Sequence, residues 1–136
     1  MSKITAVELD VKDATSIVIS AIEGGTGYWG ECKGYKWTTW YTNGGASLDD
    51  KFLRDIPRDE VLVWMREDEE NPEFGEPQND GNPWVGITIE NLEKALCIAL
   101  TKYNHLFSFR GNEIDTDATG ADVVFQIAVF GEVIFG

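Results

Sequence analysis

A run of acids, prolines and glycines in the middle of the chain limits the possible folds more than any other segment. Its sequence, EDEENPEFGEPQNDGNP at positions 67–83, contains seven acids, no base, three prolines and two glycines. Prolines and repelling charges cannot continue the interior of a sheet, so we expect an exposed loop here. Neither flank is long enough to fold well alone. The sequence therefore predicts one domain, residues 1–136, interrupted by this acidic loop.

The composition favours a folded, acidic protein. Hydrophobic residues make up 43% of the chain and aromatic residues 12%, enough to form a core. Eleven bases against 24 acids give a formal net charge of −13. This charge repels phosphate backbones and anionic lipids, so we expect a basic partner and no direct contact with nucleic acid or membrane. A charge that serves only solubility is the alternative.

Targeting segments are not evident in the sequence. The first residues, MSKITAVELD, form no long apolar stretch of the kind found in signal peptides. No other window is apolar enough for a membrane span. We therefore expect a cytoplasmic protein.

Residue spacing in the first quarter of the chain predicts a strand followed by a helix. Apolar and polar residues alternate over 4–11, as in a half-buried or edge strand. Apolar residues then recur at helical spacing over 14–23, with Asp13 placed as the N-cap. The pair Gly24-Gly25 supplies a left-handed residue to end this helix.

An aromatic tract follows at 28–41, YWGECKGYKWTTWY. Its aromatic and threonine content predicts two short strands, and the turn sequence Asn43-Gly44-Gly45 ends them. So many rings form either core packing or a surface binding patch, and both interpretations stay open. Residues 48–56 fit a short helix or turn, and 60–67 has the β-branched, apolar composition of a buried strand.

The second half of the chain predicts two more helices. One covers 89–103, with Thr88 as N-cap, and a short apolar piece follows at 105–109. Acidic residues at 115–120 form a turn, and the last helix begins near Ala121, capped by Asp117 or Thr119.

Gly131 is expected to stop the last helix before the apolar tail 133–135. An apolar tail is expected to be buried or to lie at an interface, which makes a homodimer possible. The order of elements argues for an α+β fold, a small antiparallel sheet of about three to five strands packed against about three helices.

Few residues are suited to catalysis or metal binding. Cys32, Cys97 and the lone His105 have no ligand spacing, so we expect no disulfide, metal or cofactor, and both cysteines as small apolar packing groups. With one histidine and no Ser-His-Asp pattern we expect no enzyme. The remaining enzymatic option pairs Glu23 with Asp122 or Glu132, if the first and last helices meet.

Two local motifs imitate ligand loops without completing them. The glycines at 23–30 close a helix, whereas a phosphate loop opens one. Residues 115–120 begin like a calcium loop, but Gln126 stands where that loop needs a bidentate glutamate.

The clearest binding hypotheses use charge and aromatic rings. Bases are interleaved with rings between positions 33 and 66, a combination that suits a small nucleotide. The residues placed in this possible ligand pocket are Tyr28, Trp29, Trp37, Trp40, Arg54, Arg58 and Arg110.

Spaced carboxylates can also imitate a phosphate backbone and occupy the basic groove of a nucleic-acid-binding protein. The residues placed on this partner-binding surface are Glu67, Asp68, Glu69, Glu70, Glu73, Glu76 and Asp80.

Two segments carry a family resemblance, AIEGGTGYW at 21–29 and DVVFQIAVFGEVIFG at 122–136. They resemble the boxes Ala-x-Glu-Gly-Gly-x-x-Tyr-Trp and Phe-Gly-Glu-x-x-x-Gly of an uncharacterised family of small phage and prophage proteins, and ITIENLEKAL at 87–96 extends the likeness. The matching positions are Glu23, Gly24, Gly25, Tyr28, Trp29, Asp122, Gln126, Gly131 and Glu132.

The resemblance implies that the protein acts in the context of a mobile genetic element, in the cytoplasm of a bacterial host cell. We therefore expect a non-enzymatic, DNA-mimicking inhibitor of a bacterial defence effector, of the anti-CRISPR or anti-restriction type. The alternative is a protein that sequesters a nucleotide signal in the aromatic and arginine pocket.

Overall fold

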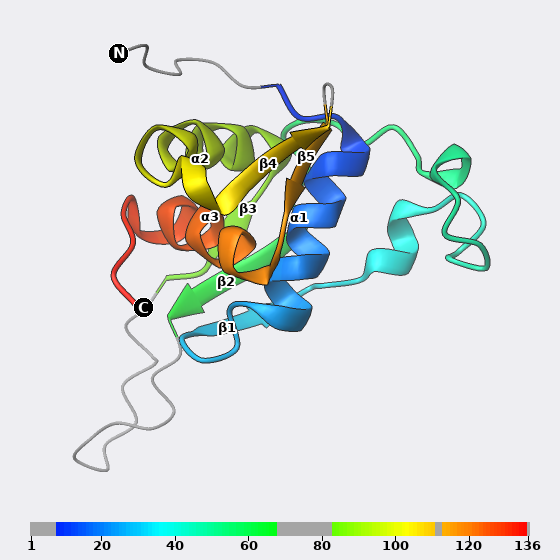
Figure 1. The fold of residues 1–136 in the computed structure, drawn as a ribbon. Coiled ribbons are helices and arrows are strands. Elements are labelled where there is room, and N and C mark those ends of the chain that lie inside the picture. The colour runs from blue at the N-terminus through cyan, green and yellow to red at the C-terminus, as the bar shows by residue number, and fades with distance from the viewer. Residues whose placement is uncertain (1–7, 68–82, 111–112, 136) are drawn as a thin grey trace.

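Three α-helices and two antiparallel sheets form the described part of the chain (Figure 1). The computed structural model describes residues 8–67, 83–110 and 113–135. The helices are α1 (Val11–Gly24), α2 (Ile89–Lys102) and α3 (Ala118–Phe130). The strands are β1 (Gly30–Lys33), β2 (Val63–Glu67), β3 (Val85–Ile87), β4 (Phe107–Arg110) and β5 (Glu113–Thr116). The predicted small α+β fold is confirmed.

Helix α3 is the centre of the packing. It contacts both α1 and α2, and Figure 1 shows it between them. Its residues 120–127 are all buried. A helix apolar on most of its circumference needs neighbours on several sides, and α1 and α2 supply them.

The larger sheet has strand order β1-β2-β3, and all its pairs are antiparallel. Val63, Met65 and Ile87 are fully buried on its inner face. Trp64 and Arg66 alternate with them and lie on the opposite face, as the two-residue period of a strand requires. The predicted acidic loop connects β2 to β3, and its residues 68–82 lie outside the described residues.

The start of α1 differs from the prediction. Asp10 is the N-cap, because its side chain accepts a hydrogen bond from the amide of Asp13, and the helix begins at Val11. Residues 8–10 are not in a strand, so the predicted strand 4–11 is wrong there, and residues 1–7 lie outside the described residues. Two aspartates three positions apart both fit an N-cap, and the earlier one is used.

The aromatic tract forms only one of its two predicted strands. β1 is present, but Trp37–Trp40 is a short 3-10 helix. It opens a long connection between β1 and β2 that passes the outer side of α1, where Tyr41 pairs with Leu53 in an isolated bridge. Trp40 is buried on this connection, so tertiary packing overrides the strand propensity of the tract. The predicted short helix or turn at 48–56 is confirmed by a 3-10 helix at Asp50–Phe52.

The caps of the other two helices follow the prediction. The side chain of Thr88 accepts from the amide of Asn91 at 3.0 Å, and that of Asp117 accepts from the amide of Gly120 at 3.0 Å. Gly131 ends α3 in the left-handed conformation, with φ of 82°. α3 begins at Ala118, three residues before the predicted start, because residues 115 and 116 belong to β5 rather than to a turn.

None of the helices in the described ranges combines the length and apolar character that crossing a bilayer requires.

Candidate binding site at the α1–α3 junction

The end of α1 lies directly against the start of α3. A Cβ atom added to Gly25 would come within 2.6 Å of the carbonyl oxygen of Ala118. Gly25 has φ of −122°, so the prediction of a left-handed residue at this helix end is wrong. The glycine is required here because any side chain would separate the two helices.

Asp122 of α3 is the centre of a polar network beside this contact, and it is only 8% exposed. Oδ2 accepts a hydrogen bond from the Tyr28 hydroxyl at 2.6 Å, and Oδ1 accepts one from the Trp29 indole nitrogen at 2.6 Å. Gln126, one turn further along α3, donates to Oδ1 at 3.1 Å. Three donors from two distant parts of the chain therefore converge on one carboxylate.

Gln126 extends the network to the C-terminal tail. Its Oε1 accepts hydrogen bonds from the amides of Ile134 at 2.9 Å and Phe135 at 2.8 Å, and its Nε2 donates to the Phe135 carbonyl at 3.2 Å. The Phe135 ring stacks on Trp29, with centroids 6.0 Å apart and planes 6° apart. The tail is thus held by side chains of the same network, and Ile134 is 48% exposed.

The tyrosine of the network is held in its neutral form. Partial burial and the hydrogen bond to Asp122 raise the pKa of Tyr28 to about 12. A phenol with this pKa donates a hydrogen bond near neutral pH and is not a nucleophile. Positioning is therefore the role that this geometry gives to Tyr28.

The three carboxylates of the predicted acid/base option have separate surroundings. Glu23 is exposed and accepts a hydrogen bond from the Tyr35 hydroxyl at 2.7 Å. Asp122 is buried with Tyr28 and Trp29, and Glu132 is exposed. α1 and α3 do meet, as that option requires, but Glu23 and Asp122 have no hydrogen-bond donor in common.

A cavity of about 580 Å³ opens beside Asp122. It lies between the α1–α3 contact, the end of α2 and the C-terminal tail. Its size is within the range of small-molecule sites. The polar side chains of its wall are Tyr28, Tyr103, Thr119, Asp122 and Gln126, and the apolar ones are Leu106, Ala118, Val123, Val133 and Phe135.

The residues predicted for a nucleotide pocket are spread over several parts of the fold. Among those whose side chains the structure describes, only Tyr28 borders the cavity, and this residue is 61% exposed. Trp29 and Trp40 are each 2% exposed within the core, and Trp37 packs edge-on against Tyr41. Arg110 lies in β4, and its side chain is outside the described part.

The two arginines of that predicted pocket are engaged in ion pairs. Arg54 binds Glu60 with both terminal nitrogens and donates from Nε to the Thr39 carbonyl at 2.8 Å. This guanidinium lowers the pKa of Glu60. Arg58 forms an ion pair with the buried Glu93, which also accepts from the Leu9 amide at 2.7 Å. Both arginines therefore stabilise chain segments.

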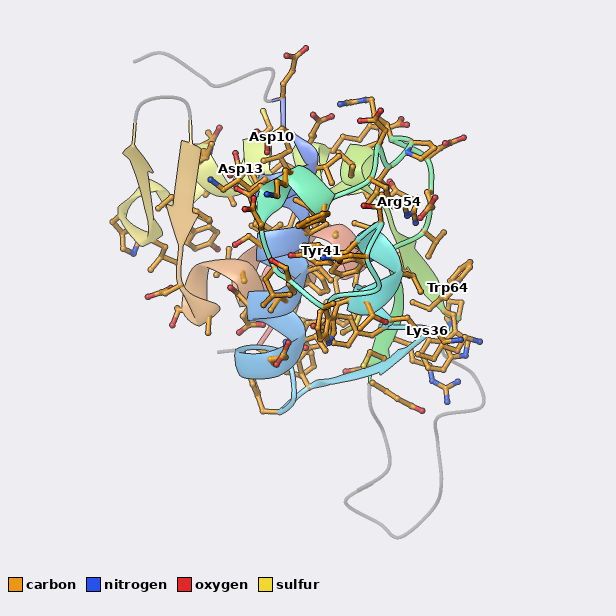
Figure 2. All side chains as sticks on the ribbon, turned by 90° about the vertical axis from the view of Figure 1, so that its right-hand side faces the viewer. Asp10, Asp13, Lys36, Tyr41, Arg54 and Trp64 are labelled. Carbon is orange, nitrogen blue, oxygen red and sulfur yellow. The ribbon has the colours of Figure 1, made fainter. Side chains whose placement is uncertain are left out.

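The outer face of the β1-β2-β3 sheet holds a cation and ring cluster that sequence analysis misses. Lys33 Nζ and Arg66 Cζ each lie 4.3 Å from the ring centroid of Trp84. Trp64 on the same face is 39% exposed, and Figure 2 shows it at the surface. The alternation of β2 places Trp64 and Arg66 on one face, but the contact with Trp84 depends on the pairing of β2 with β3.

Most of the predicted acidic partner-binding surface is not described. Glu67 ends β2 and is half-buried, while Asp68, Glu69, Glu70, Glu73, Glu76 and Asp80 lie outside the described residues. Elsewhere, six ion pairs join described bases to acids. Exposed carboxylates of the described chain include Glu8, Asp55, Asp59 and Glu132.

The cysteines and the histidine occupy surface or partly buried positions. Cys32 is exposed and Cys97 half-buried, and neither is in a disulfide, so the expected apolar packing of Cys32 is wrong. His105 is exposed. Within the described ranges, no three His, Cys, Asp or Glu residues are arranged to hold a metal ion.

Comparisons with protein-family models, with curated proteins and with solved structures give no match. We therefore infer function from the charge, the cavity and the side-chain geometry of the molecule.

Proposed function

We propose that this protein binds a basic protein surface through its carboxylates and thereby blocks a nucleic-acid-binding effector. The observation that carries the proposal is the distribution of charge. Six described bases are engaged in ion pairs with acids of the same chain. The chain has 11 bases for 24 acids, so at least 24 − 11 = 13 acids have no base of the chain to pair with, and those among them that are exposed are available to partners.

The acidic run 67–83 supports the same proposal, because its seven acids have no base among them. Spaced carboxylates compete for a groove that binds phosphates, and opposite charges accelerate the encounter. This mechanism needs no catalytic group. Together with the resemblance to phage proteins, it makes a bacterial defence effector, a CRISPR effector or a restriction enzyme, the proposed target inside the host cell.

The test is a pull-down of purified effectors of these two kinds at low and at high salt. The variant Asp68→Asn, Glu69→Gln, Glu70→Gln is expected to lose capture, and high salt is expected to weaken capture by the unchanged protein. The matched control, Asp55→Asn, Asp59→Asn, Glu132→Gln, removes the same charge from exposed positions elsewhere and should retain most binding. Equal capture by the two variants would exclude a localised acidic site.

Binding of a nucleotide signal is the second candidate function, carried by the cluster on the outer sheet face. Lys33 places positive charge beside Trp84, whereas Arg66 on the same ring is paired with Glu31, and the neighbouring Trp64 is exposed. A base can stack on an exposed indole while cations attract its phosphate. We therefore propose this sheet face as the nucleotide site, in place of the pocket predicted from the sequence.

Thermal-shift screening with cyclic and linear nucleotides separates the two functions. A nucleotide-binding protein shows a ligand-dependent rise in melting temperature, and Trp64→Leu abolishes it. Trp37→Leu is the control for loss of an indole, because it removes a half-buried tryptophan from the connection between β1 and β2. A protein-binding mimic shows no rise with any nucleotide.

A further inference from the structure

The cavity beside Asp122 has the charge pattern of a cation site. Asp122 is the one charged side chain in its described wall, and no lysine or arginine lines it. An anionic ligand would meet a buried carboxylate without a compensating base, which is unfavourable. A ligand with a positive group would instead neutralise that carboxylate.

Asp122 has acceptor capacity left for such a group. Oδ1 accepts two hydrogen bonds, from Trp29 and Gln126, whereas Oδ2 accepts one, from Tyr28. A carboxylate offers about four lone-pair positions, so the known donors do not exhaust it. The same donors fix the carboxylate in place, which lowers the cost of ordering it when a ligand binds.

The rest of the wall suits the carbon skeleton of an organic cation. Leu106, Val123 and Val133 supply aliphatic surface, and Tyr28 and Tyr103 supply aromatic rings that attract cations at their faces. A hydrated metal ion would make no favourable contacts with this apolar wall. A neutral apolar molecule would leave the carboxylate without a new partner.

We propose that this cavity binds the ammonium group of a small organic amine, with the ammonium on Oδ2 of Asp122 and the carbon skeleton against the apolar wall. This inference goes beyond the proposed function, because neither an acidic mimic nor the outer sheet face needs the cavity. The same chemistry can come from a free amine or from a lysine side chain of a protein partner.

The experiment titrates the full chain with three matched probes and follows its amide resonances by NMR. The probes are phenethylamine, the neutral phenethyl alcohol and the anionic phenylacetate. We expect phenethylamine to shift resonances at the α1–α3 junction and to bind at least about ten-fold more tightly than the alcohol, as one charge-assisted hydrogen bond implies. Equal affinities for amine and alcohol, or no saturable shift up to about 10 mM amine, would overturn the proposal.

A parallel titration with Nα-acetyl-lysine methylamide distinguishes the source. Tighter binding of this model than of phenethylamine indicates a lysine side chain, and the reverse order indicates a free amine. Either order supports an ammonium site.

Three variants test whether the amine binds in the cavity. Asp122→Asn removes the charge but keeps an acceptor for Trp29, and should weaken phenethylamine about ten-fold or more. Asp59→Asn removes one charge from an exposed position and should leave binding unchanged. Should Asp122→Asn fail to fold, Thr119→Phe fills the cavity from an exposed wall position and should abolish binding. Binding that persists in Thr119→Phe places the amine elsewhere and refutes the proposal.

Discussion

At the scale of single residues, the contact between the end of α1 and the start of α3 depends on a position without a side chain. Gly25→Ala brings a Cβ atom against the Ala118 carbonyl, at 2.6 Å before relaxation. The helices must separate, so we expect a loss of about 2 kcal/mol in the free energy of unfolding, typical of overpacking. Urea denaturation measures this loss.

The control for this substitution is two positions away. A Cβ at Gly27 would have no atom within 4 Å. Gly27→Ala should therefore change stability by less than about 1 kcal/mol, with a small gain from the less flexible unfolded chain. Equal losses in the two variants would contradict the close contact.

The raised pKa of Tyr28 predicts how stability depends on alkaline pH. The phenol titrates at 10.0 in its ordinary state and at about 12 in the folded protein, because of partial burial and the Asp122 carboxylate. A raised folded pKa contributes stability that is complete below pH 10 and is lost as pH rises toward 12. Urea midpoints across this interval should fall, and less steeply in Tyr28→Phe.

In Tyr28→Phe, part of the loss of stability at alkaline pH should remain. Burial and the hydrogen bond to Glu23 also raise the pKa of Tyr35, so this second phenol contributes with the same sign. Tyrosinate absorbance of the folded protein gives an independent measurement. If Tyr28 ionises at its ordinary pKa, its hydrogen bond to Asp122 does not persist in solution.

At the scale of elements, the C-terminal tail is docked by one side chain of α3. Gln126→Leu removes the acceptor for the Ile134 and Phe135 amides and the donor to the Phe135 carbonyl. We expect a loss of about 2 kcal/mol in stability, in the range for broken buried hydrogen bonds. Amide exchange at the two tail residues should accelerate, and Trp29 fluorescence should change because Phe135 no longer stacks on it.

Ile134→Ala is the matched control for the tail. The Ile134 side chain is 48% exposed, and its backbone bond to Gln126 does not need that side chain. Stability should therefore change by less than about 0.5 kcal/mol. A large effect here with none in Gln126→Leu would show that apolar packing, and not the glutamine, docks the tail.

The elements that sequence analysis predicts well are those with strong local determinants. Thr88 and Asp117 cap α2 and α3, and Gly131 ends α3, because each cap forms within a few residues. The 3-10 helix at Trp37–Trp40 escapes prediction because its fold depends on tertiary burial of Trp40, which the local aromatic pattern does not contain.

The candidate site could be predicted only in part, for the same reason. Tyr28, Trp29, Asp122 and Gln126 stand out in the sequence as positions of two motifs. Their hydrogen bonds join residues more than 90 positions apart, such as Tyr28 and Asp122, and depend on how α1 packs against α3. The cavity beside them also needs the end of α2 and the tail, which no local pattern indicates.

At the scale of the whole molecule, ion pairs stabilise the folded state, whereas the net charge destabilises it. The pair of Arg54 with Glu60 closes a local segment of the chain, and the pair of Arg58 with Glu93 joins residues 35 positions apart. Salt screens and weakens the exposed pairs, such as those of Lys12 with Asp50 and of Lys94 with Glu90. The net charge of −13 instead repels itself throughout the folded state, and salt relieves that repulsion.

Repulsion should dominate, because 24 acids face only 11 bases. We expect the melting temperature to rise by about 3 °C between low salt and about 0.5 M sodium chloride, which corresponds to about 1 kcal/mol. The variant Asp68→Asn, Glu69→Gln, Glu70→Gln should melt higher at low salt and respond less to salt. A melting temperature that falls with salt would mean that the ion pairs outweigh the repulsion. Binding to a basic partner should weaken over the same salt range, so opposite salt dependences of folding and binding are the signature expected of an acidic mimic.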